Sequence, residues 1–155
     1  MQNVNYFPHI EQILAALHIS HGRLDGHSKV AVDVRLLRAV LQAVAARLPF
    51  DEAFYLTTYP DVAEAHRQGA IADPHQHYIE RGFFEGRLGI APEVDEAFYT
   101  ARYKDVAKAV ARGDVVSAAM HYQTSGIAEG RVPNAATQPV VDYWAAILQG
   151  DSGRA

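Results

Sequence analysis

The residues best suited to chemistry in this chain are its histidines, because the sequence has eight of them and no cysteine. An imidazole can bind a divalent metal ion or move a proton near neutral pH. His75 and His77 stand two positions apart and could supply two ligands. If both are helical, however, their side chains point about 200° apart and cannot reach one ion. A metal site of His75 and His77 is therefore the alternative to a structural role.

A second group of histidines, His18, His21 and His27, brackets a polar loop near the N-terminus. Loop position leaves these rings free to converge, but no carboxylate accompanies them at ligand spacing. The absence of cysteine excludes disulfides, a thiol nucleophile and cysteine-based metal sites. We expect no cofactor and no resident metal.

The carboxylates could serve as general acids or bases, but each candidate stands where a helix is expected to begin. Asp51 and Asp95 suit N-cap positions, while Asp61 and Asp105 fall in the first turn of a following helix. The sequence has no glycine-rich phosphate loop, nucleophile elbow or His-Glu-x-x-His run. We therefore expect that the chain is not an enzyme.

An internal repeat organises the sequence. Residues 50–87 align without a gap with residues 94–131, at an offset of 44. The first copy reads FDEAFYLTTYPDVAEAHRQGAIADPHQHYIERGFFEGR, and the second reads VDEAFYTARYKDVAKAVARGDVVSAAMHYQTSGIAEGR. So many identities at one offset indicate a duplicated structural unit.

Each copy is predicted to form three short helices joined by tight turns. Asp51 is expected to cap the first helix, and Phe50 and Tyr55 to form a hydrophobic staple across that cap. Pro60 suits the first position of the second helix, and the third helix is expected to end at Gly82. The second copy predicts the same elements 44 residues later.

Helices are also predicted outside the repeat. Apolar residues at helical spacing indicate two N-terminal helices and one C-terminal helix, and no segment alternates long enough to require a strand. The sequence predicts an all-α protein of two tandem three-helix units of about 40 residues each. Its expected domains are an N-terminal helical pair at 1–49, the repeat at 50–134 with units 50–89 and 94–133, and a capping helix with a frayed tail at 135–155.

The arginine that closes each unit is expected to pair with the first-turn aspartate of the same unit. This predicts a structural clasp of Asp61 with Arg87, and of Asp105 with Arg131. An exposed ion pair contributes about 0.2–1 kcal/mol, and a buried bidentate pair contributes more. The recurring histidine, His77 in the first copy, is interpreted as a buried helix residue whose ring hydrogen-bonds the backbone.

Aromatic residues that recur at one position of the repeat are interpreted as core between helices. Phe83 and Phe84 differ, because isoleucine and alanine replace them in the second copy. Variation within a constant frame is where a binding surface can be placed. We therefore expect Phe83, Phe84 and Trp144 to contact a partner or a glycan.

The pattern Asp-Glu-x-Phe-Tyr, Tyr-Pro-Asp-Val-Ala, Gly, His-Tyr, Gly and Glu-Gly-Arg resembles a short helical repeat of bacterial surface-polysaccharide proteins. Similar segments are appended to glycosyltransferases and to large secreted calcium-binding or adhesin-like proteins. The resemblance covers residues 50–134, and the second copy departs from it with Lys104 and Ala118 where the first has prolines. It implies an accessory module and supplies no catalytic residues.

Composition narrows the classes of partner. The chain has 14 Lys and Arg against 18 Asp and Glu, and this acidic balance argues against nucleic acid as a partner. No apolar run approaches the ~20 residues that a membrane-spanning helix requires. With no secretory signal, we expect a cytoplasmic interaction or assembly module of a bacterial polysaccharide or cell-surface system. It would bind a protein partner or a glycan, and it would form a homodimer if the N-terminal pair exposes an apolar stripe. The alternative is a helical protein that binds a metal or small ligand through histidines.

Overall fold

The structure, a computed structural model, describes residues 6–24, 26 and 29–149. Every regular element within these ranges is helical, which confirms the all-α class. The chain divides into two compact units, residues 1–90 and 91–155, and each contains one copy of the repeat. His27 and the tail expected to fray, residues 150–155, lie outside the described residues.

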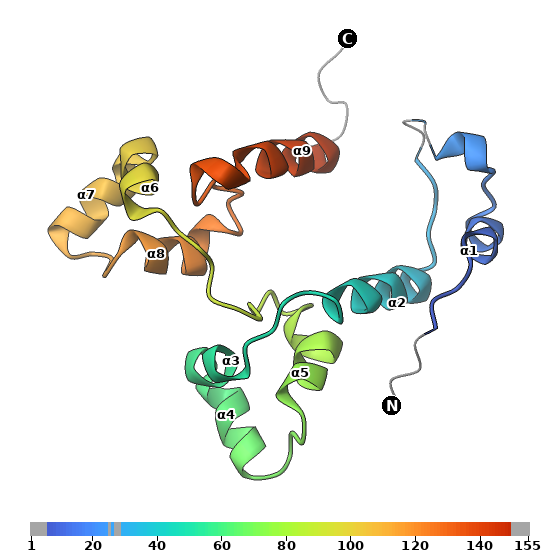
Figure 1. Ribbon diagram of the computed structural model, residues 1–155, viewed down its shortest axis with the longest axis horizontal. Helices are drawn as coiled ribbons and strands as arrows, with labels where there is room; N and C mark the ends of the chain where they lie inside the picture. Colours follow the sequence, from blue (N-terminus) through green and yellow to red (C-terminus); the bar gives the residue numbers. More distant parts are fainter. Residues whose placement is uncertain (1–5, 25, 27–28, 150–155) are drawn as a thin grey trace. The chain divides into compact units, whose positions relative to one another are not determined.

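The first unit contains α1 to α5, drawn from blue to green in Figure 1. The bounds are α1 (Ile10–Leu17), the 3₁₀ turn η1 (His21–Arg23), α2 (Val34–Ala45), α3 (Glu52–Thr58), α4 (Pro60–Arg67), α5 (Pro74–His77) and the π-helical turn η2 (Tyr78–Gly82). Helix α3 contacts both α4 and α5, and α2 packs against η2.

The second unit contains α6 to α9, drawn from yellow to red in Figure 1. The bounds are α6 (Glu96–Arg102), α7 (Lys104–Arg112), α8 (Ala118–His121), the π-helical turn η3 (Tyr122–Gly126), the 3₁₀ turn η4 (Ala135–Thr137) and α9 (Gln138–Gln149). Helices α6, α7 and α8 contact one another, and α9 packs against η4.

Local sequence explains where the repeat helices begin. The carboxylate of Asp51 accepts a hydrogen bond from the backbone N–H of Phe54, and Pro60 opens α4. The rings of Phe50 and Tyr55 lie 5.2 Å apart across the α3 cap, as a hydrophobic staple requires. In the second unit, Asp95 caps α6 in the same way.

The third element of each copy differs from the prediction of one continuous α-helix. Helix α5 is four residues long and continues as a π-helical turn, in which Phe83 N–H donates to the carbonyl of Tyr78. The wider turn places Gly82 against the side chain of Tyr55. A Cβ added at Gly82 would lie 2.1 Å from the Tyr55 hydroxyl oxygen, so only glycine fits there. Gly126 meets Tyr99 in the same manner.

The core of each unit is small and centred on one tyrosine. Tyr55 and Tyr99 are fully buried, and their neighbours are the valine of the second helix and residues of the third element. Burying a large apolar side chain contributes about 1.5–3 kcal/mol. Few residues are buried in each unit. The polar contacts that close the unit are therefore important for holding its helices together.

Candidate functional site

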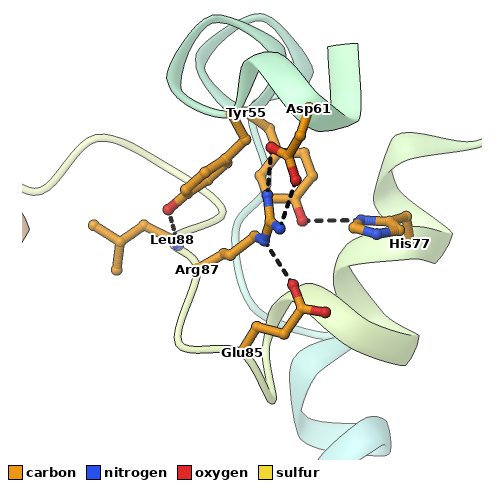
Figure 2. A network of polar contacts seen from close by, with 7 residues as sticks. Tyr55, Asp61, His77, Glu85, Arg87 and Leu88 are labelled. Atoms are coloured by element: carbon orange, nitrogen blue, oxygen red, sulfur yellow. Dashed lines mark hydrogen bonds and ion pairs between the residues drawn. The ribbon is translucent and has the colours of Figure 1, made fainter. Parts of the chain in front are cut away.

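The best-defined polar network lies at the closing turn of the first unit (Figure 2). The guanidinium of Arg87 makes a bidentate pair with Asp61, with Nη1–Oδ1 and Nη2–Oδ2 distances of 2.9 and 2.8 Å. Its Nε donates to Glu85 at 2.7 Å, and its Cζ lies 4.9 Å from the ring centroid of Tyr59. The pair between Arg87 and Asp61 is the one that the repeat predicts.

The second unit repeats this network. Arg131 pairs with Asp105 at 2.8 Å, contacts Glu129 through Nε, and lies 4.8 Å from the ring of Tyr103. Both arginines are about four-fifths buried, while both aspartates are mostly exposed. Because the same contacts recur at an offset of 44 residues, they indicate a structural role in closing each copy of the repeat.

The charges of the clasp suit ion pairing and not proton transfer. Hydrogen bonds from Arg87 lower the pKa of Asp61 to about 2, and those from Arg131 lower the pKa of Asp105. A carboxylate with so low a pKa is a poor base near neutral pH.

Sequence reasoning missed a second contact that holds the closing segment. The hydroxyl of Tyr59 accepts a hydrogen bond from the backbone N–H of Leu88 at 2.7 Å, and Tyr103 accepts one from Val132 at 2.8 Å. The sequence does contain a hint of this contact, because the tyrosine recurs in both copies, one residue before the second helix. Both tyrosines are half-buried, and a tyrosine hydroxyl withdrawn from water usually finds such a partner.

The recurring histidine is half-buried, and its ring hydrogen-bonds a tyrosine and not the backbone, so the prediction of a buried ring bonded to the backbone was wrong. Nδ1 of His77 lies 3.1 Å from the hydroxyl of Tyr55, and Nδ1 of His121 lies 3.2 Å from the hydroxyl of Tyr99. The tyrosine side chain reaches the ring because α3 packs against α5. Burial raises the pKa of Tyr55 to about 12 and lowers the pKa of His77.

The two histidines of the alternative metal site are engaged separately. The ring of His75 stacks on Phe50 at 4.6 Å between centroids, whereas His77 binds Tyr55. Nε2 of His75 is buried without a hydrogen-bond partner. Leaving this polar atom unpaired costs free energy of folding. Nowhere in the described ranges do three or more His, Cys, Asp or Glu side chains form a group that could hold a metal.

In the N-terminal group of histidines, Nε2 of His21 lies 3.4 Å from a carboxylate oxygen of Glu11. His18 ends α1 in a left-handed conformation and donates its backbone N–H to carbonyls of that helix. His27 is outside the described residues.

Phe83 and Phe84 are half-buried and contact residues of their own unit. Phe83 packs edge-on against Tyr78, and the guanidinium of Arg38 lies 4.1 Å from the ring centroid of Phe84. Arg38 also donates to the backbone carbonyl of Glu80 at 2.7 Å. The variable position of the repeat is therefore where α2 docks in the first unit.

Trp144, in contrast, lies on an open helix face. Its side chain is 54% exposed, and it belongs to a row of exposed apolar residues along α9. This row, called here the α9 face, consists of Val140, Tyr143, Trp144, Ile147 and Leu148. The spacing of i, i+3, i+4, i+7 and i+8 places all five on one side of the helix.

No charged residue belongs to the α9 face. Asp142 is the charged residue of the helix, and it projects about 200° around the axis from Val140, on the opposite side. Its carboxylate accepts a hydrogen bond from Gln138 at 2.6 Å. Between residues 138 and 148 no side chain is buried, so the apolar side of the predicted capping helix is open.

Comparisons of the chain with protein-family models, with curated proteins and with solved structures found no match. None of the helices in the described ranges combines the length and the hydropathy that crossing a bilayer requires.

Proposed function

We propose that this protein is a non-enzymatic interaction module that binds a protein partner through the α9 face. The observation that carries the proposal is the row of five exposed apolar side chains, each 51–78% exposed, on one side of a twelve-residue helix. Contiguous apolar surface of this kind is unfavourable in water and marks sites of association. Tyrosine and tryptophan are also the side chains that dominate binding energy at protein interfaces.

The chemistry of the face favours a protein over a glycan. Sugars need hydrogen-bond donors and acceptors beside an aromatic platform, whereas Val140, Ile147 and Leu148 offer only aliphatic surface. Tyr143 and Trp144 meet edge-on, with ring centroids 5.8 Å apart, and do not form one flat platform. An amphipathic helix of a partner would cover such a row.

The polar residues support a role without catalysis. The first-turn aspartate and the closing arginine of each copy are held in the clasps, and the recurring histidines are held by tyrosines. The resemblance of the repeat to polysaccharide-associated proteins supports placing the module in a bacterial polysaccharide or cell-surface system. The contacts disfavour a histidine-based metal site, because His75 and His77 each have a different aromatic partner.

Site-directed photo-crosslinking in the native cell tests the proposal. A photoreactive residue at position 144 should yield discrete protein adducts, which mass spectrometry identifies. The same residue at position 146, exposed on the same helix but off the face, is the matched control. Adducts with glycan alone, or equal adduct patterns at both positions, would contradict the proposal.

A further inference from the structure

We infer that a polar cleft in the first unit binds a sugar acid, that is, a sugar ring recognised through a carboxylate and through its hydroxyl groups. The cleft has a volume of about 520 Å³ and lies where α2 packs against η2. This volume is within the ~300–1,000 Å³ of ordinary small-molecule sites. The α9 face belongs to the second unit, so this inference does not depend on the proposed function.

Five polar side chains line the cleft from two sides. Helix α2 contributes Arg38 and Gln42, which are four positions apart and therefore lie on the same side of the helix. The facing segment, from α5 into η2, contributes Gln76, Glu80 and Arg81. Two aliphatic side chains complete the lining. Amide and carboxylate groups form hydrogen bonds with hydroxyl groups, and guanidinium groups bind anions.

The charge of the cleft favours an anion. Arg38 donates to the backbone carbonyl of Glu80 and lies over the ring of Phe84, so it is held in place without a carboxylate partner. Within the described part of the chain, Arg81 forms no ion pair either. The carboxylate of Glu80 instead accepts a hydrogen bond from Gln76 at 2.6 Å. Two guanidinium groups against one carboxylate leave one net positive charge in a chain whose net charge is −4.

The same groups favour a hydroxylated carboxylate over a phosphate. A carboxylate carries one negative charge and matches the fork of a guanidinium, whereas a phosphate group carries about −1.5 to −2 at pH 7 and would be repelled by Glu80. The ionised Glu80 can only accept hydrogen bonds, so it suits a ligand hydroxyl. Gln42 is half-buried, and its amide has no hydrogen-bond partner among the residues that the structure describes. It can both donate to and accept from a second hydroxyl.

The cleft is a property of the first copy of the repeat alone. At the positions of Gln76, Glu80 and Arg81, the second copy has methionine, threonine and serine. His77 and Tyr78, which stand between them and belong to the packing of the unit, recur unchanged. Residues that vary while their structural neighbours stay constant indicate a binding site.

Nuclear magnetic resonance of the full ¹⁵N-labelled chain tests the site. The protein is titrated with glucuronate, glucose and glucose 6-phosphate, which share one ring and differ in the group at a single carbon. Glucuronate should shift the backbone amide signals of the residues that line the cleft, and it should bind more tightly than the other two sugars. Shifts confined to other residues, equal binding of glucose, or tighter binding of glucose 6-phosphate would each overturn the inference.

Variants of exposed residues test the roles of the charges. Arg81→Gln should weaken glucuronate binding about 10-fold or more, because a charge-assisted hydrogen bond is lost. Arg112→Gln makes the same change at an exposed arginine of the second unit and should bind like wild type. Equal affinities of these two variants would exclude recognition by Arg81. Glu80→Gln should raise the affinity for glucose 6-phosphate relative to glucuronate, and an unchanged preference would contradict the charge argument.

An oligomer of glucuronate distinguishes the source of the ligand. Tighter binding of the oligomer than of the single sugar supports a site for an acidic polysaccharide, and equal or weaker binding supports a site for the free sugar acid. The amide spectrum of each variant shows whether its fold is retained. Photo-crosslinking at position 144 tests the α9 face separately, so failure of the cleft leaves the proposed function standing.

Discussion

The hydroxyl of Tyr55 lies 3.1 Å from Nδ1 of His77, beside the closing clasp of the first unit (Figure 2). The pair recurs as Tyr99 and His121 at 3.2 Å. A histidine that looks available for chemistry in the sequence is thereby committed to holding α5 against α3.

This pairing makes the stability of the first unit depend on pH. Burial lowers the pKa of His77 in the folded state below its ordinary value of 6.5. The unfolded chain therefore binds the proton first, and stability present above pH ~6.5 is lost as pH falls through the lowered pKa. His77→Gln removes the titrating group, so thermal melts should show a smaller loss for the variant than for wild type between neutral and mildly acidic pH. Equal losses would contradict the prediction.

The glycine beside Tyr55 should not tolerate a methyl group. Gly82→Ala would place its Cβ 2.1 Å from the Tyr55 hydroxyl oxygen and should lower the free energy of unfolding by about 2 kcal/mol or more. Tyr55→Phe removes that oxygen, so the double variant should be more stable than the two single effects predict. Gly22→Ala, where no atom lies within 4 Å, is the control. Additive effects in denaturant titrations would contradict the clash.

The bidentate geometry of the clasp predicts that arginine cannot be replaced by lysine. Arg87→Lys keeps the charge but loses the fork that contacts Asp61, and it should cost about 1 kcal/mol, which corresponds to roughly 4–8 °C in melting temperature. The Asp61 carboxylate is 64% exposed, so solvent screening limits the energy of the pair. A melting temperature equal to that of wild type would show that the clasp contributes nothing.

The same clasp predicts sensitivity to acid. The pKa of Asp61 falls from 3.8 to about 2 on folding, so the stabilisation is complete above pH ~4 and is lost as pH falls toward 2. Asp61→Asn should therefore differ from wild type near neutral pH and approach it in strong acid. A difference that is constant over this range would contradict the pairing.

The two central tyrosines should ionise late. Burial raises the pKa values of Tyr55 and Tyr99 to about 12. A tyrosinate absorbance titration of the eight tyrosines should thus show a fraction that ionises only in strong alkali, together with unfolding. Tyr55→Phe and Tyr99→Phe should each remove part of that late fraction. Titration of all tyrosines near pH ~10 would be inconsistent with the cores described.

The sequence predicted those features that depend on local pattern or on repetition. The caps at Asp51 and Asp95 follow from helix chemistry, and the pairing of Asp61 with Arg87 follows because both residues recur together. The π-helical turn and the contact of His77 with Tyr55 could not be predicted, because they depend on how α3 packs against α5. The contact of Arg38 with Phe84 could not be predicted either, because 46 residues separate the two in the sequence.

The α9 face is open in the free chain, and we expect it to become covered when a partner binds. Trp144 is the single tryptophan of the protein, so its fluorescence reports on this face alone. In the free chain, its emission should be red-shifted and readily quenched by iodide, and covering of the face by a bound protein should shift the emission to the blue and protect it. Emission that is already blue-shifted and protected in the free chain would contradict the account.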